Sequence, residues 1–326
     1  MSKERDETGA TLAFGADFND VLVGDFTYGG GSMTLASDYT GTLIIPTLNG
    51  RRILNDGVNI VGGGVDSTFA GNGTLILKGS SRIDGAIGAV NSLSSVSIFN
   101  KAGGSVEGFG GTFCSKSLTL GEHSGTASFA CATNIQNQVV FRALDQNLMF
   151  CATAILSDGV NFAGHAAQIT VDSAAGNSTL MGALITTINN TGTLAVTGGS
   201  NTVTIIDQVG ANGHAISSVT IADYTDAIFG SAVYTKDLTV GSGRVSFNGD
   251  VIISGKLTVK GVVAFSNYVD LEGAEVDISG GGDITFDRAV DITGCKFIGD
   301  LEHIHFLGDV IGEWQVEGLG FVDSDE

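Results

Sequence analysis

Proline and basic residues are scarce in this chain of 326 residues, and each scarcity excludes something. A single Pro stands beside 49 Gly. Pro removes a donor from a β-ladder, whereas Gly supplies positive φ at corners, so the composition favours uninterrupted ladders joined by tight turns. Lys and Arg total 15 against 35 Asp and Glu, which gives a formal net charge of -20. This balance argues against nucleic acid and against an anionic membrane as partners.

Long apolar runs are also lacking. The longest lies within residues 148–156 and is much shorter than the roughly 18 residues that a membrane-spanning helix needs, so no membrane span is predicted. The N-terminus has no basic segment followed by an apolar one, so no secretory signal is visible. We expect either an intracellular protein or a piece of a longer chain whose signal lies upstream.

The four cysteines show neither a CxxC motif nor another zinc spacing. Cys114 and Cys295 are expected to point inward as small core side chains. Cys131 and Cys151 are expected on opposite faces of the chain, which disfavours a disulfide between them.

Pairs of apolar residues at i and i+2 recur at a nearly constant interval in the C-terminal third. Such residues point to the same face of a strand, so three pairs per period of about 20 residues predict one coil of a three-sided parallel β-solenoid. The first pair of each coil begins at 238, 257, 276 and 295. The pairs are Leu238/Val240, Val245/Phe247 and Val251/Ile253; Leu257/Val259, Val263/Phe265 and Val269/Leu271; Val276/Ile278, Ile284/Phe286 and Val290/Ile292; and Cys295/Phe297, Ile304/Phe306 and Val310/Gly312.

A second block keeps the same pattern with slightly longer coils. Its pairs are Leu118/Leu120, Ala127/Phe129 and Thr133/Ile135; Val139/Phe141, Leu148/Phe150 and Ala154/Leu156; and Val160/Phe162 and Ile169/Val171. Two longer stretches, about 73–131 and 192–249, also share phrases: GTL recurs at 73 and 192, and KSLTLG at 116 corresponds to KDLTVG at 236. An internal duplication of a multi-coil unit is therefore predicted.

These patterns predict an all-β fold, a right-handed parallel β-helix (β-solenoid) with three strands per coil of about 19–21 residues. At that length the chain allows roughly 16 coils. No composition break divides it, so residues 1–326 are expected to form a single elongated domain. The charged ends, residues 1–8 and 323–326, and Trp314, where the coil pattern fades, are expected to help cap the stack.

Functional side chains of a solenoid must point outward, and two small sets of outward residues are candidates. His303 and His305 flank inward Ile304 near Glu302 and offer metal ligands, but two such histidines are also ordinary on a surface strand. Asp270 and Asp291 follow Val269 and Val290, which places two carboxylates roughly 5 Å apart on adjacent coils, the spacing in retaining glycosidases. The equivalent positions on either side are Ile252 and Ile311, so the pair lacks a polar surround. Solvated corner acids or a weak calcium site are therefore favoured over a catalytic dyad.

Gly-rich segments at 61–66 and 280–283 lack the tandem nine-residue period of calcium-binding β-rolls and are interpreted as tight turns. No catalytic, cofactor-binding or metal-binding residues are therefore predicted.

The phrase KDLTVGSGRVSFNG at 236–249, its counterpart at 116–129, and the GTL and SSVTI motifs resemble repeats in the passenger regions of rickettsial autotransporters, the surface cell antigens and outer membrane protein B. The resemblance covers about residues 70 to 260. It implies a β-helical passenger displayed at the cell surface or outer membrane, with a host-cell receptor or an envelope component as partner and a translocator barrel elsewhere. The chain departs from that family in having no signal peptide and no C-terminal barrel segment, which suits a passenger fragment or a split reading frame.

Two functions follow as hypotheses. The first is a non-enzymatic, structural or adhesive β-solenoid. The alternative is a carbohydrate-active β-helix, a lyase or hydrolase, whose substrate groove would gather Asp, Arg and Lys on one face. The few basic residues are thinly spread and favour the first hypothesis.

Overall fold

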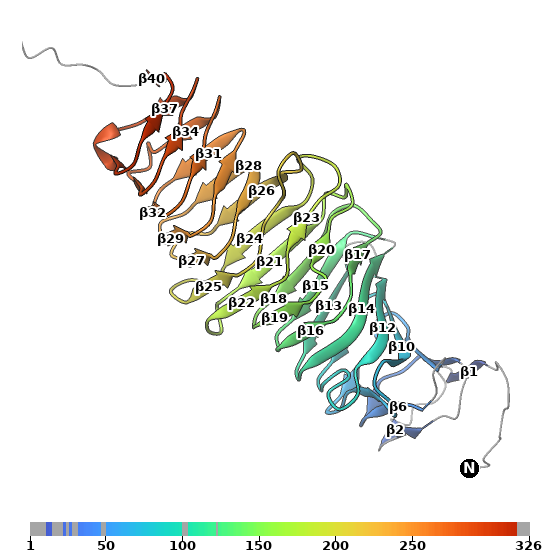
Figure 1. Ribbon diagram of the computed structural model, residues 1–326. Helices are drawn as coiled ribbons and strands as arrows, with labels where there is room; N and C mark the ends of the chain where they lie inside the picture. The colour runs from blue at the N-terminus through green and yellow to red at the C-terminus, as the bar shows by residue number, and fades with distance from the viewer. Residues whose placement is uncertain are drawn as a thin grey trace, which may run out of the picture. The chain divides into compact units, whose positions relative to one another are not determined.

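The computed structural model describes residues 11–14, 22–23, 26–27, 32–46, 50–99, 104–121 and 123–317. In this part the protein is all-β, with parallel strands stacked as a β-solenoid of about 13 turns and one short 3-10 helix (Figure 1). The predicted fold class is confirmed. The number of turns is lower than the roughly 16 predicted, because several coils exceed 20 residues. The expected charged caps at 1–8 and 323–326 lie outside the described residues.

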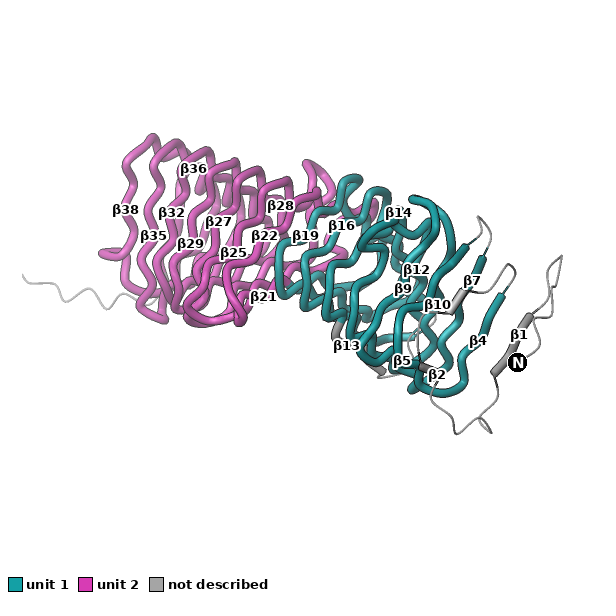
Figure 2. Tube along the Cα trace, turned by 90° about the horizontal axis from the view of Figure 1, so that it is seen from below, with its two compact units in different colours: residues 1–170 teal, residues 171–326 magenta. Residues whose placement is uncertain are grey.

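The chain divides into two compact units, residues 1–170 and 171–326 (Figure 2). The two stretches of the predicted duplication fall one in each unit. Strand β21 (Gln168–Asp172) contains the division.

The first unit holds strands of two to nine residues. They are β1 (Thr11–Phe14), β2 (Leu22–Val23), β3 (Phe26–Thr27), β4 (Ser32–Leu35), β5 (Tyr39–Thr40), β6 (Leu43–Ile45), β7 (Arg51–Leu54), β8 (Ile60–Val61), β9 (Val65–Ser67), β10 (Asn72–Lys78), β11 (Arg82–Ile83), β12 (Leu93–Phe99), β13 (Gly104–Phe109), β14 (Phe113–Gly121), β15 (Gly125–Phe129), β16 (Thr133–Ile135), β17 (Val139–Phe141), β18 (Gln146–Phe150), β19 (Ala154–Leu156) and β20 (Val160–Asn161).

Most strands of the first unit pair with a strand one coil later, whereas β9 meets only the isolated bridge at Ile87. One row runs β4, β7, β10, β12 and β14, all parallel. The predicted register of the second block is confirmed, because Leu118 lies beside Val139 and Val139 beside Val160. Strand β14 turns a corner without a break and pairs with both β16 and β17.

The second unit repeats this plan. Its elements are β22 (Ser178–Met181), β23 (Leu184–Ile185), β24 (Thr193–Thr197), β25 (Thr202–Ile205), β26 (Ile216–Ile221), β27 (Asp226–Phe229), β28 (Val233–Val240), β29 (Arg244–Phe247), β30 (Val251–Ile253), β31 (Lys256–Val259), β32 (Val262–Phe265), β33 (Val269–Asp270), β34 (Glu275–Asp277), β35 (Asp283–Phe286), β36 (Val290–Asp291), β37 (Lys296–Ile298), η1 (Leu301–His303), β38 (Ile304–Phe306), β39 (Val310–Ile311) and β40 (Gln315–Glu317).

Three parallel rows form the sides of this unit. They are β24–β26–β28–β31–β34–β37–β40, β25–β27–β29–β32–β35–β38 and the row from the first part of β28 through β30, β33 and β36 to β39. Strand β28, like β14, pairs with two strands of the next coil. Strand pairing continues past Trp314 into β40, one strand further than predicted, but none of residues 307–316 is buried, so the inward apolar pattern fades here as predicted. Trp314 packs edge-on against Phe297, with ring centroids 5.4 Å apart.

Stacked phenylalanines fill the core of the second unit. The ring centroids of Phe229, Phe247, Phe265, Phe286 and Phe306 follow one another at 4.6, 5.1, 5.2 and 5.3 Å. In the first unit Phe129 and Phe150 stack at 5.6 Å. The prediction that these inward residues are buried is confirmed except for Phe306, which is half-buried in the last described coil.

The predicted constant step of 19 residues fails once. Val276 lies beside Phe297 and not beside Cys295. The corner around Gly280–Gly282 holds two residues more than the equivalent corner around Gly261, and it shifts all later strands. Cys295 instead occupies the turn position of Ala274, and both are buried as expected of an inward cysteine.

Coils around residues 178–229 are longer than predicted. Leu180 lies beside Ile205, and Leu194 lies beside Val219, steps of 25 residues in each case. The additional residues form the loops at 186–192 and 206–215, outside the strands. Apolar pairing in the sequence fixes the strands but says little about how long the corners between them are.

Glycine at 63 and 64 is required by the close approach of neighbouring coils. A Cβ on Gly63 would overlap the backbone carbonyl of Gly41, and one on Gly64 would overlap that of Ala86, whereas Gly62 has φ +67 and open space around it. The interpretation of this segment as a tight turn is consistent with that geometry.

Gly63→Ala is therefore expected to lower the free energy of unfolding by about 1–3 kcal/mol, because the neighbouring backbone must move. Urea denaturation followed by circular dichroism measures the change. Gly62→Asn serves as the control, since Asn tolerates positive φ and meets nothing, and it should cost well under about 1 kcal/mol. Equal effects of the two substitutions would contradict the close-approach explanation.

Candidate functional site

Outward Asp and Asn side chains at the corners mostly accept hydrogen bonds from backbone N–H groups of the next coil. Asp226 Oδ1 accepts from Arg244 N at 2.8 Å, and Asp237 Oδ1 accepts from Lys256 N at 3.0 Å. In the same way Asn177 Oδ1 accepts from Thr202 N at 3.0 Å. A carboxylate that accepts from backbone donors satisfies groups that the corner leaves unpaired. Much of the acidic character thus serves contacts between coils.

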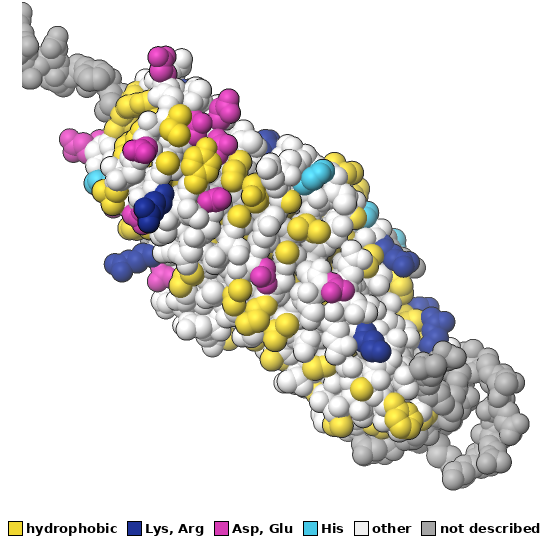
Figure 3. All heavy atoms as spheres, in the orientation of Figure 1, with side chains coloured by type: hydrophobic (Ala, Val, Ile, Leu, Met, Phe, Trp, Pro, Cys, Tyr) yellow, Lys and Arg dark blue, Asp and Glu magenta, His cyan; other side chains and the backbone are white. Residues whose placement is uncertain are grey.

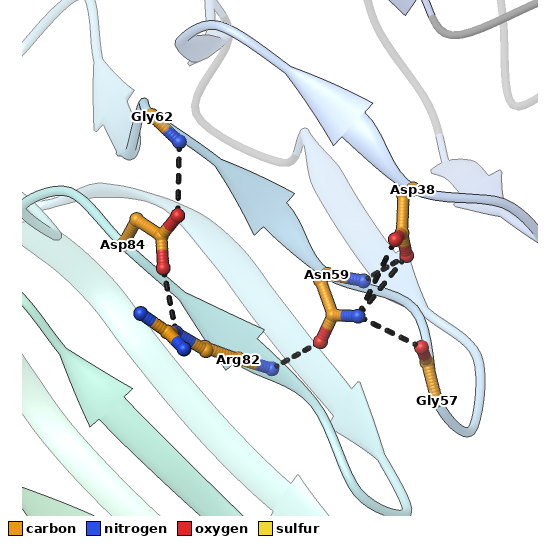
Figure 4. A network of polar contacts seen from close by, with 6 residues as sticks. All are labelled: Asp38, Gly57, Asn59, Gly62, Arg82 and Asp84. Carbon is orange, nitrogen blue, oxygen red and sulfur yellow. Dashed lines mark hydrogen bonds and ion pairs between the residues drawn. The ribbon is translucent and has the colours of Figure 1, made fainter.

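One such network lies in the first unit (Figure 4). Asp38 Oδ1 accepts from Asn59 N at 2.8 Å, and Asn59 Oδ1 accepts from Arg82 N at 2.9 Å. The Arg82 guanidinium pairs with Asp84 at 2.7 Å, and Asp84 Oδ2 accepts from Gly62 N at 3.2 Å. Three successive coils are joined by this chain of contacts, so these polar groups serve the fold itself.

Alternating charges line the row of β28, β31, β34 and β37. Asp237, Lys256, Glu275 and Lys296 lie side by side on successive coils. Lys256 Nζ lies 2.8 Å from Glu275 and donates to Asp277 at 2.9 Å. Hydrogen bonds from the Ser279 hydroxyl and from Lys256 lower the pKa of Asp277 to about 2. The four residues of the row carry no net charge together, and ionised Asp277 adds one negative charge that Lys256 contacts directly.

Asp270 and Asp291 lie side by side in β33 and β36, as predicted, with Ile252 and Ile311 as their neighbours. Asp270 Oδ1 accepts from Glu272 N at 2.9 Å. Asp291 Oδ1 accepts from the N–H and hydroxyl of Thr293 at 2.9 and 2.6 Å, and these bonds lower the pKa of Asp291. A glycosidase acid needs a raised pKa, the opposite direction.

The histidines considered as metal ligands do not share a cluster. His303 ends η1, and its Nδ1 lies 2.6 Å from Asp283 Oδ1. His305 is exposed in the middle of β38, while the Glu302 N–H belongs to the turn capped by Asp300. The described residues hold no group of three or more His, Cys, Asp or Glu side chains suited to a metal ion.

The contact with Asp283, chiefly its hydrogen bond, raises the pKa of His303. Because the folded-state pKa is raised, this pair stabilises the fold below the ordinary pKa of about 6.5, and the contribution is lost as pH rises through the raised pKa. Asp283→Asn is expected to lower the pKa of His303 in an NMR titration. Asp287→Asn is the control, and an unchanged His303 titration in Asp283→Asn would contradict the assignment.

All four cysteines are free thiols. Cys114 was expected to point inward, and this expectation is wrong: in β14 the buried neighbours are Phe113 and Ser115, and Cys114 is half-buried between them. Burial raises the pKa of Cys131 to about 11, and that of Cys295 to about 12. Thiols with such values are weak nucleophiles near neutral pH.

One buried charge was not predicted. Arg52 in β7 points inward and is fully buried, and its Nη2 donates to Ile44 O at 2.7 Å. The signal was present in the sequence, because Arg52 and Leu54 have the i, i+2 spacing of an inward pair. A charged residue in that position went against the apolar pattern.

On the face drawn in Figure 3, carboxylates gather over the C-terminal coils and basic side chains stand singly. In the part of the chain that the structure describes, no helix has the length and apolar character to cross a membrane. Fold and surface together define a parallel β-solenoid protein. Comparison with protein-family models, curated proteins and solved structures found no match.

Proposed function

We propose that the protein is a non-enzymatic, passenger-type β-solenoid that is displayed at a cell surface and serves a structural or adhesive role. The observation that carries the proposal is the use of outward polar groups within the fold itself. The corner acids accept from the next coil, and the two stacked aspartates are held by their own loops. The resemblance of residues 70–260 to autotransporter passengers supports surface display, with a host-cell receptor or envelope component as partner.

Exposed apolar side chains support a binding role. Large ones distributed over both units include Phe69, Val90, Tyr224 and Val262. Burying any of them against a partner would remove apolar surface from water and stabilise a complex.

Adhesion of protein-coated beads to cultured epithelial cells tests the proposal. Beads that carry the full chain should adhere well above beads that carry an unrelated soluble protein of similar charge. Equal adhesion of the two would contradict the adhesive role.

The alternative, a carbohydrate-active enzyme, is favoured by one observation, the stacking of Asp270 on Asp291. We expect no reducing ends and no unsaturated sugars when the protein is incubated with acidic or neutral polysaccharides. Reproducible product formation that is abolished by Asp270→Asn together with Asp291→Asn would support the carbohydrate-active enzyme and contradict the non-enzymatic role.

A further inference from the structure

Exposed apolar side chains concentrate at the C-terminal end of the described coils. Of the sixteen large apolar side chains that are exposed in the described residues, five lie within residues 307–316. They are Leu307, Val310, Ile311, Trp314 and Val316, with exposed fractions of 70%, 43%, 47%, 43% and 37%. Elsewhere in the described part of the chain, no stretch of ten residues holds more than two.

Two of these side chains hold core positions at the end of the stack. Val310 pairs with Val290, and Val316 pairs with Phe297, and both of these partners are buried. The row of stacked phenylalanines ends in the same way at half-buried Phe306. The exposed surface is therefore a cross-section of the apolar core, and covering it requires one further layer of strand.

The backbone at this end forms the edge of a sheet. Val290 N donates to Asp309 O at 2.9 Å. Ile292 N donates to Ile311 O at the same distance, 2.9 Å. Along a parallel strand, successive residues bond alternately to the strands on either side. The N–H and C=O of Val310 therefore point to where a further parallel strand would lie, and such an edge can accept an extended segment.

The surroundings of this edge are acidic. Residues 300–316 contain no Lys or Arg and have four exposed carboxylates, those of Asp300, Glu302, Asp309 and Glu313. Of the two histidines in that range, His303 contacts Asp283 of the coil below. The preceding coil, residues 276–299, adds four acidic and two basic residues. This local excess of negative charge favours a cationic occupant.

Charge disfavours an occupant from the chain itself. Residues 318–326 contain three acidic residues and no basic one. A second copy would bring an equally acidic C-terminal end, and its residues 1–30 contain six acidic residues against two basic ones. Like charges that meet at a contact repel one another, so a basic segment of another protein fits this edge best.

We propose that the edge of β39 binds an extended basic segment of a partner protein, one in which Lys or Arg alternates with apolar residues. The segment adds to the stack as a further parallel strand. Its apolar side chains cover Val310 and the exposed end of the core, and its cationic side chains meet the surrounding carboxylates. This contact goes beyond the adhesive role proposed above and does not depend on it, because it concerns one end of the solenoid wherever the protein is displayed.

Fluorescence anisotropy tests the proposal with the full chain and a labelled eight-residue peptide of alternating lysine and valine. Saturable binding is expected, and a rise in NaCl from about 50 to 500 mM should weaken it by screening the carboxylates. A peptide with glutamate in place of lysine should bind at least about tenfold more weakly, because it is repelled. A lysine–valine peptide methylated on the backbone nitrogens of its four central residues keeps its charge but loses its donors, and it should also bind at least about tenfold more weakly.

Ile311→Lys/Glu313→Lys locates the contact, since both side chains are exposed at β39. Peptide binding to this variant should fall by about tenfold or more. Ile155→Lys/Asp158→Lys is the matched control, because it makes the same charge changes at exposed residues of the first unit, and it should bind the peptide like the unmodified protein. Circular dichroism melting checks that both variants fold.

The possible failures are distinguishable. Absence of saturable binding up to about 1 mM peptide would overturn this proposal and leave the adhesive role, which the bead assay tests, unaffected. Equal binding of the glutamate peptide or of the methylated peptide would overturn the basic partner or the strand addition, respectively. Normal binding by Ile311→Lys/Glu313→Lys would overturn the location. Binding that requires removal of residues 318–326 would overturn the partner protein and assign the edge to the chain's own C-terminal residues.

Discussion

Phe265→Ala is expected to lower the free energy of unfolding by about 3–5 kcal/mol, the range for removing a large aromatic side chain from a packed core. Phe265 is fully buried and stacks between Phe247 and Phe286, with centroid distances of 5.1 and 5.2 Å. Loss of the ring leaves a cavity and removes two stacking contacts at once. The neighbouring backbones are held by ladders on both sides and have little freedom to close the cavity.

Urea denaturation monitored by circular dichroism measures this effect. Val262→Ala provides the control, because Val262 belongs to the same strand and its side chain is 45% exposed. It should change the unfolding free energy by less than about 0.5 kcal/mol. A small effect of Phe265→Ala, comparable to that of Val262→Ala, would show that the aromatic stack does not hold the coils together.

Arg52→Ala should cost about 3 kcal/mol or more, because it leaves a cavity and removes buried donors. Arg52 lies between Met33 and Leu75 in the row of parallel strands, and both of these neighbours are fully buried. Its guanidinium donates to the carbonyls of Ile44 and Arg51 at 2.7 and 3.2 Å. Alanine leaves both carbonyls without these donors.

Arg51→Ala is the matched control, since Arg51 is the adjacent residue of the same strand and is exposed. It should alter the unfolding free energy by no more than about 0.5 kcal/mol. Arg52→Met fills the volume without restoring the hydrogen bonds and should fall between the two, near 1–2 kcal/mol. The same melting curve for Arg51→Ala and Arg52→Ala would refute a special role of the buried guanidinium.

Apolar pairing predicted most of the strands because alternation along a strand is a strictly local property. Pairs such as Leu238/Val240 and Val263/Phe265 are indeed buried together. The pattern failed where corners differ in length, as at Gly280–Gly282, since nothing in the pairing counts the residues between two strands. It also failed for Cys114. Side chains alternate along β14, and because Phe113 and Ser115 point inward, Cys114 between them does not.

The polar surface was less predictable from the sequence. The stacking of Asp270 on Asp291 followed from the coil period and is confirmed. The bonds from Thr293 to Asp291 and from His303 to Asp283 depend on turn geometry and on which coil lies alongside. A sequence read one strand at a time does not contain that information.

The direction of the corner hydrogen bonds has a consequence for how the chain assembles. In most of them the acceptor belongs to the earlier coil and the donor to the later one, as for Asp38 with Asn59, Asp226 with Arg244, and Asp237 with Lys256. A folded coil therefore offers acceptors to the segment emerging next during synthesis. Each addition closes a loop of only about 20 residues, a modest entropy loss. Each coil of a repeat stack docks only onto its neighbour. We therefore expect coils to dock faster onto a folded N-terminal part than onto a folded C-terminal part.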